Sequence, residues 1–170
     1  TVLGVTLGIG LVILVEIYLD NLVQSPFARS GLLLGISIAA HNFPEGLALG
    51  SSFLTISNLG PTLSIAMLLH NIPEGLSMSI PLRANKFPPI KILFYSTLAG
   101  LPTGIGAFVG AYAGSISNIL ISLCLSFAGG TMLYIISDEI IPNAKLLYKG
   151  RASSLGIVLG FLIGILLYFR

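Results

Sequence analysis

One apolar stretch carries the features that decide the fold: residues 31–53 read GLLLGISIAAHNFPEGLALGSSF. A helix of about 20 apolar residues crosses the hydrocarbon layer of a bilayer, so this stretch predicts a membrane-spanning helix. Near its middle stand three polar residues, His41, Asn42 and Glu45. An ionisable side chain at that depth costs about 3 kcal/mol, and it persists where it is paired, wetted or bound to a cation. The stretch therefore predicts a membrane helix with a polar site near the bilayer midplane.

A second copy of the same motif follows, because HNFPEG at residues 41–46 is matched by HNIPEG at residues 70–75. On a helix, residues i and i+4 differ by about 40° in direction, so the His and the Glu of each copy share one face. Each copy begins near the middle of its apolar run, which puts both motifs at the same depth. The candidate metal ligands are His41, Asn42, Glu45, His70, Asn71 and Glu74.

The donor atoms of these side chains indicate the kind of cation. Imidazole nitrogen with carboxylate and amide oxygen suits Zn²⁺, Fe²⁺, Mn²⁺, Co²⁺, Ni²⁺ or Cd²⁺ alike; it is too rich in nitrogen for a dedicated Ca²⁺ or Mg²⁺ cage. Pro44 and Pro73 cannot donate to the preceding turn, so each helix is expected to kink and to expose a carbonyl beside the ligands. Gly46 and Gly75 are expected to let a neighbouring helix come close. Interrupted helices that meet at the midplane are the general plan of a transporter site.

The whole chain has the composition of a membrane protein, with 170 residues that are 55% hydrophobic and 8% charged. Its fold class is predicted to be all-α, a polytopic membrane helical bundle with six transmembrane helices. The net charge of +2 is too small to indicate nucleic-acid binding. Cys124 is the only cysteine, which excludes an intramolecular disulfide and a thiolate zinc cluster. The predicted spans are residues 1–19, 31–53, 62–82, 92–113, 118–141 and 153–169.

Basic residues indicate the orientation of these spans. They follow the first, third and fifth spans, and none follows the second or fourth. The positive-inside rule therefore puts those three loops in the cytoplasm and both ends of the chain, Thr1 and Arg170, outside. We expect an integral protein of the cell membrane, whether the bacterial inner or the plasma membrane. The basic loop residues are Arg29, Arg83, Lys86, Lys91, Lys145, Lys149 and Arg151.

At its motifs the chain resembles the ZIP (Zrt/Irt-like) family of divalent metal transporters, in particular its GufA-like branch. The segments that carry the resemblance are residues 40–46, 69–75, 79–82, 128–134 and 138–142. The family has eight spans, and the resemblance covers the third to the eighth. It implies that residues 1–170 are one membrane transporter domain that lacks its first two spans.

The resemblance also implies roles for individual residues. A main metal site would be formed by His41, Glu45, His70 and Glu74, with Asn42 and Asn71 facing a second metal position. The bundle that carries the motifs would slide against a scaffold to give alternating access and import into the cytoplasm. Many relatives place a Glu in an A-E-P-type segment of the sixth span, whereas residues 101–104 read LPTG here. Thr103 is the nearest candidate for that position by alignment, which puts the second metal in question.

Other functions remain open on the sequence alone. The main alternative is an intramembrane metal-dependent hydrolase, but the chain has no HExxH motif and no midplane carboxylate beyond the paired ones. A membrane assembly or receptor protein with a structural metal is a third class. No resident cofactor is expected, and the partners are the transported divalent ion, the lipid bilayer and, as a candidate, a second copy of the chain. Glu16, Asp20, Asp138 and Glu139 lie toward the cytoplasmic span ends, either for metal release or as interfacial carboxylates beside Lys and Arg.

Overall fold

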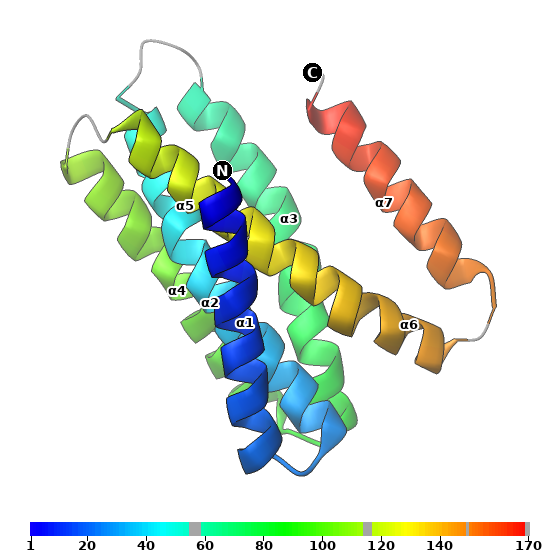
Figure 1. Ribbon diagram of the computed structural model, residues 1–170. Coiled ribbons are helices and arrows are strands. Elements are labelled where there is room, and N and C mark those ends of the chain that lie inside the picture. Colours follow the sequence, from blue (N-terminus) through cyan, green and yellow to red (C-terminus); the bar gives the residue numbers. More distant parts are fainter. Residues whose placement is uncertain (55–58, 114–116, 149, 169–170) are drawn as a thin grey trace. The chain divides into compact units, whose positions relative to one another are not determined.

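The computed structural model describes residues 1–54, 59–113, 117–148 and 150–168, and every regular element within these ranges is a helix (Figure 1). The all-α prediction is confirmed. Each predicted span coincides with a helical segment, the fifth being made by three successive elements, α5, η1 and α6. In chain order the elements are α1 (Val2–Leu22), α2 (Pro26–Ser52), α3 (Leu59–Ala84), α4 (Pro89–Tyr112), α5 (Asn118–Ile135), the π-helical turn η1 (Ile136–Ile140), α6 (Ile141–Leu147) and α7 (Ala152–Tyr168).

Four of these segments are long and apolar enough to cross a membrane: α1, α2, α4 and residues Ile119–Leu146. α3 has 26 residues, enough in length, but its polar motif and its two internal prolines make it less apolar. α7 is an apolar helix of 17 residues. Helices are the elements that satisfy their own backbone hydrogen bonds in lipid, so a helical membrane bundle follows from both composition and structure.

The helices extend beyond the predicted spans at several ends. α2 begins at Pro26, although the sequence placed residues up to Ser30 in a loop. Proline at the first helical position has a suitable φ and loses no helical hydrogen bond, so the polar first turn is helical before the apolar run starts. α2 and α3 also continue through Pro44 and Pro73. Lys149 and Arg170, which entered the orientation argument, lie outside the described residues.

The chain divides into two compact units, residues 1–135 and residues 136–170. The first unit contains α1 to α5 and both motifs, and the second contains η1, α6 and α7. The functional arguments below concern the first unit, unless the second is named.

Within the first unit, α1 packs on α5 through small residues. A Cβ added at Gly4 would overlap Ser126 Oγ and lie 2.7 Å from the backbone oxygen of Leu123, and one at Gly8 would overlap the backbone oxygen of Phe127. From the other side, a Cβ at Gly130 would overlap the backbone oxygen of Val5. Glycine is thus required for this backbone-to-backbone approach, which is the usual way in which helices pack in lipid.

α2 packs on α4 in the same manner and with more glycines. A Cβ at Gly46 would overlap the carbonyl oxygen of Thr103, and a Cβ at Gly106 would overlap that of Phe43. One turn further on, Gly50 and Gly110 meet carbonyl oxygens of the facing helix in the same way. The close approach predicted at Gly46 is therefore present.

The corresponding expectation for Gly75 is wrong, since a Cβ at this position would meet nothing within 4 Å among the described residues. Gly75 lies instead in the wall of a cavity. The two copies of the motif differ in sequence only at Phe43 and Ile72, but they sit in different surroundings. α2 is covered by α4 at its motif glycine, whereas α3 borders a cavity at its own.

Candidate metal site

The two motifs meet between α2 and α3, and each histidine pairs with the glutamate of the other copy. His41 Nε2 lies 3.0 Å from Glu74 Oε1, and His70 Nε2 lies 3.2 Å from Glu45 Oε2. A third separation, 4.0 Å, joins His70 Nε2 to Glu74 Oε1 within α3. Four predicted ligands from two helices are thus brought to one place.

These separations are compatible with shared coordination of one ion. Two ligands at about 2.0–2.1 Å from zinc, at a tetrahedral angle, lie about 3.3 Å from each other. The observed distances of 3.0, 3.2 and 4.0 Å bracket that value. The contacts run in a line from Glu45 through His70 and Glu74 to His41. One ion bound by all four side chains would bring Glu45 and His41 closer together.

The site is enclosed mainly from the α2 side. His41 is 4% exposed and Glu45 is 8% exposed, while the side chain of His70 on α3 is 35% exposed. His70 Nδ1 lies 3.2 Å from the carbonyl oxygen of Ala66, one turn earlier. A carbonyl acceptor at Nδ1 favours the tautomer that keeps its proton there and leaves Nε2 as the ligand atom.

Asn42 is held by α4. Its Nδ2 donates a hydrogen bond of 2.9 Å to the carbonyl oxygen of Ala99, which leaves its Oδ1 free to accept. Asn42 is 2% exposed, and its Oδ1 has no hydrogen-bond partner among the described residues. The same is true of Asn71 Oδ1 and Glu74 Oε2, both of which are buried. Buried oxygens without protein partners are rare, and oxygens of this kind suit a bound water or cation.

These oxygens belong to residues that line a cavity of about 300 Å³ between α2, α3 and α4. The cavity wall includes three predicted ligands, Asn42, Asn71 and Glu74, together with Ser96 and Gly100 of α4. Its volume exceeds the space needed by one water molecule several-fold. The cavity thus offers room for an ion with part of its hydration shell beside the His–Glu pairs.

Thr103 does not take the place that alignment suggested. It is not among the residues of the cavity wall, whereas Gly100, one turn earlier on α4, is. The carbonyl oxygen of Thr103 packs on Gly46, and its buried Oγ1 has no hydrogen-bond partner among the described residues. A Cβ at Gly100 would meet nothing within 4 Å there. Position 100 is therefore an α4 position in the cavity wall at which a side chain can be added without contact at its Cβ.

A second polar group lies near the C-terminal end of α1, where the sequence indicated carboxylates either for metal release or for interfacial pairing with basic residues. Arg29 of α2 donates to Asp20 Oδ1 at 2.6 Å and to Glu16 Oε1 at 3.3 Å, and Tyr134 of α5 donates to Glu16 Oε2 at 2.8 Å. The pairing agrees with the reading of Glu16 and Asp20 as interfacial carboxylates beside a basic residue. The spacing of Glu16 and Asp20 by four residues was the signal for a shared partner.

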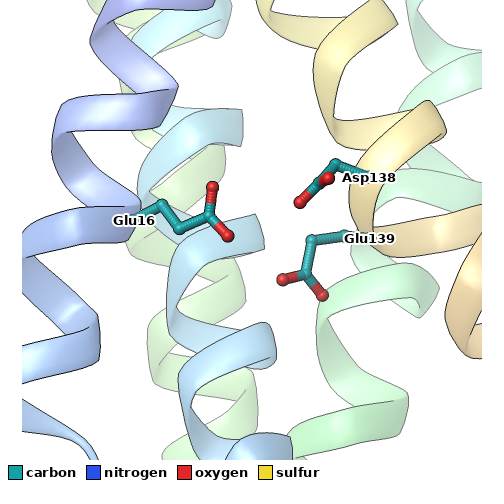
Figure 2. A group of neighbouring side chains, drawn as sticks. All are labelled: Glu16, Asp138 and Glu139. Carbon is teal, nitrogen blue, oxygen red and sulfur yellow. The ribbon is translucent and has the colours of Figure 1, made fainter.

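The carboxylates of the second unit lie on its π-helical turn. Asp138 and Glu139 leave η1 toward the same side (Figure 2), and Asn143 Nδ2 donates to Glu139 Oε2 at 2.9 Å. A π-helical turn adds a residue to the helix and is common at functional sites.

Comparison with known proteins agrees with the motifs and the helical bundle. The family model described as ZIP Zinc transporter matches residues 20–168. The zinc transporter GufA of Myxococcus xanthus is 38% identical over 140 residues, which cover 82% of this chain and 55% of the relative. The zinc transporter ZIP11 of Homo sapiens is 37% identical over 153 residues, covering 84% and 44% respectively.

A third relative, the zinc transporter ZupT of Campylobacter jejuni, is 40% identical over 137 residues, covering 79% of this chain and 47% of the relative. The chain thus spans about half the length of the curated relatives that it matches. The named relatives are transporters rather than enzymes. On its sequence match, its paired HNxPEG helices and its all-helical membrane architecture, the chain belongs to the ZIP family.

Proposed function

We propose that the protein carries divalent transition-metal ions, zinc foremost, across the cell membrane into the cytoplasm by alternating access. The ions would bind at the His41, Glu45, His70 and Glu74 side chains between α2 and α3. A second, weaker position would be the cavity beside Asn42 and Asn71. Fe²⁺, Mn²⁺, Co²⁺, Ni²⁺ and Cd²⁺ are further substrates that the donor set allows.

The observation that carries the proposal is the reciprocal pairing of the two motifs. Each ion-binding half comes from a different helix, and the nitrogen-to-oxygen distances of 3.0 and 3.2 Å match those between ligands of one ion. A site carried by two helices of the sliding bundle moves with that bundle and can open to either side of the membrane. This is a property that a translocation site needs and a structural metal site does not.

Direction is proposed from the distribution of basic residues. Arg29, Arg83 and Lys86 lie at or beside the α1–α2 and α3–α4 connections, which the positive-inside rule assigns to the cytoplasm. An ion that enters from the outside would then leave toward these connections.

The test is uptake of metal into proteoliposomes that contain the natural protein, with a panel of divalent ions. Replacing Glu45 or Glu74 by Ala should lower the initial rate at least tenfold, because a ligand and a midplane charge are lost together. Replacing Asn21, an exposed residue of the last α1 turn, by Ala should leave the rate unchanged. Normal uptake by correctly inserted Glu45→Ala and Glu74→Ala proteins would remove this site from the transport path.

The hydrolase alternative is not favoured. A catalytic metal site keeps an open position with a separate acid or base, while here the carboxylates at the site are both paired with histidines. A peptide or lipid hydrolysis assay on the same reconstituted protein gives the direct comparison.

A further inference from the structure

Two pairs of helices in the first unit pack backbone to backbone, and each pair is treated below as one body. α1 and α5 meet at Gly4, Gly8 and Gly130, and α2 and α4 meet at Gly46 and its neighbours along the helix. Because carbonyl oxygens of one helix fill the space above the glycines of the other, neither pair can shear without overlap. α3 joins the α2–α4 pair, since its motif pairs with that of α2.

Arg29 connects these two bodies. It lies in the first turn of α2 and donates to two carboxylates of α1, at 2.6 Å to Asp20 and at 3.3 Å to Glu16. Tyr134 of α5 donates to the second oxygen of Glu16, which fixes this carboxylate within the α1–α5 body. The side chains of Arg29 and Glu16 are 26% and 18% exposed, whereas that of Asp20 is 55% exposed.

The two carboxylates lie one helical turn apart. Residues 16 and 20 of α1 are i and i+4, so they lie on one face and are separated by about 6 Å along the axis. α2 runs antiparallel to α1 after a short connection (Figure 1). If α2 moves toward the Thr1 end of α1, Arg29 approaches Glu16 and leaves Asp20. If α2 moves the opposite way, Arg29 keeps Asp20 and leaves Glu16.

The connection between the helices permits such a movement. Between Leu22 and Pro26 there are four Cα–Cα steps, which span at most about 14 Å. Packed helices lie about 8–10 Å apart, so the connection accommodates an axial shift of one helical turn, about 5.4 Å. One-turn displacements of one helix past another are a known form of conformational switching.

We propose that Glu16 and Asp20 are two alternative partners for Arg29, one for each of two positions of the α2–α3–α4 body relative to the α1–α5 body. The inference rests on the alternating-access function proposed above. The physical reason is charge compensation: the Arg29 side chain is only 26% exposed, and a second carboxylate one turn away offers it an acidic partner at both ends of the movement. Tyr134 acts as a positioning residue for the Glu16 partner.

Neutralising one carboxylate should bias the equilibrium toward the position that uses the other. Glu16→Gln should favour the Asp20-paired position, and Asp20→Asn should favour the Glu16-paired position. For partly exposed ion pairs the expected shift in the ratio of the two states is about 2- to 5-fold in each case. The shifts should have opposite signs, which an ion pair with a purely static role does not produce.

The test uses a reporter cysteine in the cavity. Ser96 lines the cavity and lies outside the proposed ligand set, so Ser96→Cys is introduced after Cys124→Ala has removed the natural thiol. The natural protein is reconstituted, and the rate of labelling by a membrane-impermeant thiol reagent is measured from each side. Opposite changes in the ratio of the two rates for Glu16→Gln and Asp20→Asn support the proposal.

Equal changes, or no change in either variant, overturn it, as does a loss of thermal stability in both without a change in labelling. If Glu16→Gln does not fold, Tyr134→Phe serves instead, and it should shift the ratio in the direction expected for Glu16→Gln by a smaller factor. Metal uptake by the unmodified protein is measured in parallel. Absent uptake contradicts the proposed function, whereas normal uptake with unshifted labelling contradicts only the role of Glu16 and Asp20.

Discussion

Replacing Gly100 by Glu should create strong binding of a second metal ion in the cavity between α2, α3 and α4. The unmodified site has two carboxylates, Glu45 and Glu74, against four positive charges of two divalent ions. A charge left uncompensated in a low-dielectric setting is costly, so the second ion of the unmodified protein should bind weakly. Gly100 lies in the cavity wall, and a Cβ there meets nothing within 4 Å among the described residues. A carboxylate can therefore be added without displacing a described side chain at its Cβ.

The size of the effect follows from Coulomb's law. Two unit charges about 4 Å apart attract by about 4 kcal/mol at an effective dielectric constant of 20, hence by about 8 kcal/mol for a divalent ion. Removing the new carboxylate from water costs several kcal/mol of that attraction. Even about 1.4 kcal/mol of net gain raises the affinity of the second ion tenfold, and we expect at least this increase. The first ion, held by the His–Glu pairs, should change little.

Calorimetric titration and anomalous scattering at limiting metal give the assay, with Gly100→Gln as the neutral control of equal size. Two ions bound with equal affinity by the unmodified protein would refute the charge argument. So would equal affinities of the Gln and Glu variants for the second ion. Thr103→Glu should instead disturb the protein, because the Thr103 side-chain oxygen is buried and its carbonyl packs on Gly46.

Three further predictions concern packing, topology and pH. Gly46→Ala should lower the stability of the protein in detergent by about 1–3 kcal/mol, because the added Cβ overlaps a carbonyl oxygen, whereas Gly75→Ala should be neutral. Equal melting temperatures of these two variants would contradict the α2–α4 packing. A cysteine in place of Lys86 should react with a membrane-impermeant reagent only from the cytoplasmic side, and one in place of Ala113 only from outside. The opposite labelling would reverse the proposed direction of metal transport. Metal affinity should fall from about pH 8 to about pH 5, because protons compete for imidazoles and carboxylates, and a flat calorimetric profile would indicate other ligands.

The sequence predicted the helices well because lipid leaves few alternatives. Apolar runs of sufficient length become helices, and the six predicted stretches coincide with helical segments. Boundaries were less predictable, as Pro26 illustrates: hydropathy detects the apolar run, whereas the helix begins where the backbone can start one.

At the candidate site, the sequence predicted which residues share a helix face, but not which residues of the other helix they meet. The crossed pairing of His41 with Glu74 depends on the relative height of α2 and α3, which motif spacing does not specify. The different surroundings of Gly46 and Gly75 depend on where α4 packs. The rotation of α4 about its axis decides that Gly100, and not Thr103, lies in the cavity wall. Such relations between helices arise from tertiary packing and carry no local sequence signal.

The crossed pairing also bears on how the protein enters the membrane during synthesis. Inserted singly, α2 or α3 would bring a His and a Glu into the hydrocarbon layer with their partners absent, at a cost of about 3 kcal/mol for an ionised group. When both helices insert together as a hairpin, each histidine reaches a glutamate of the other helix and the polar groups shield one another from lipid. The nascent chain is thus expected to release these two helices into the bilayer as a pair, so that the groups proposed to bind the cargo are also the groups that join the hairpin during biogenesis.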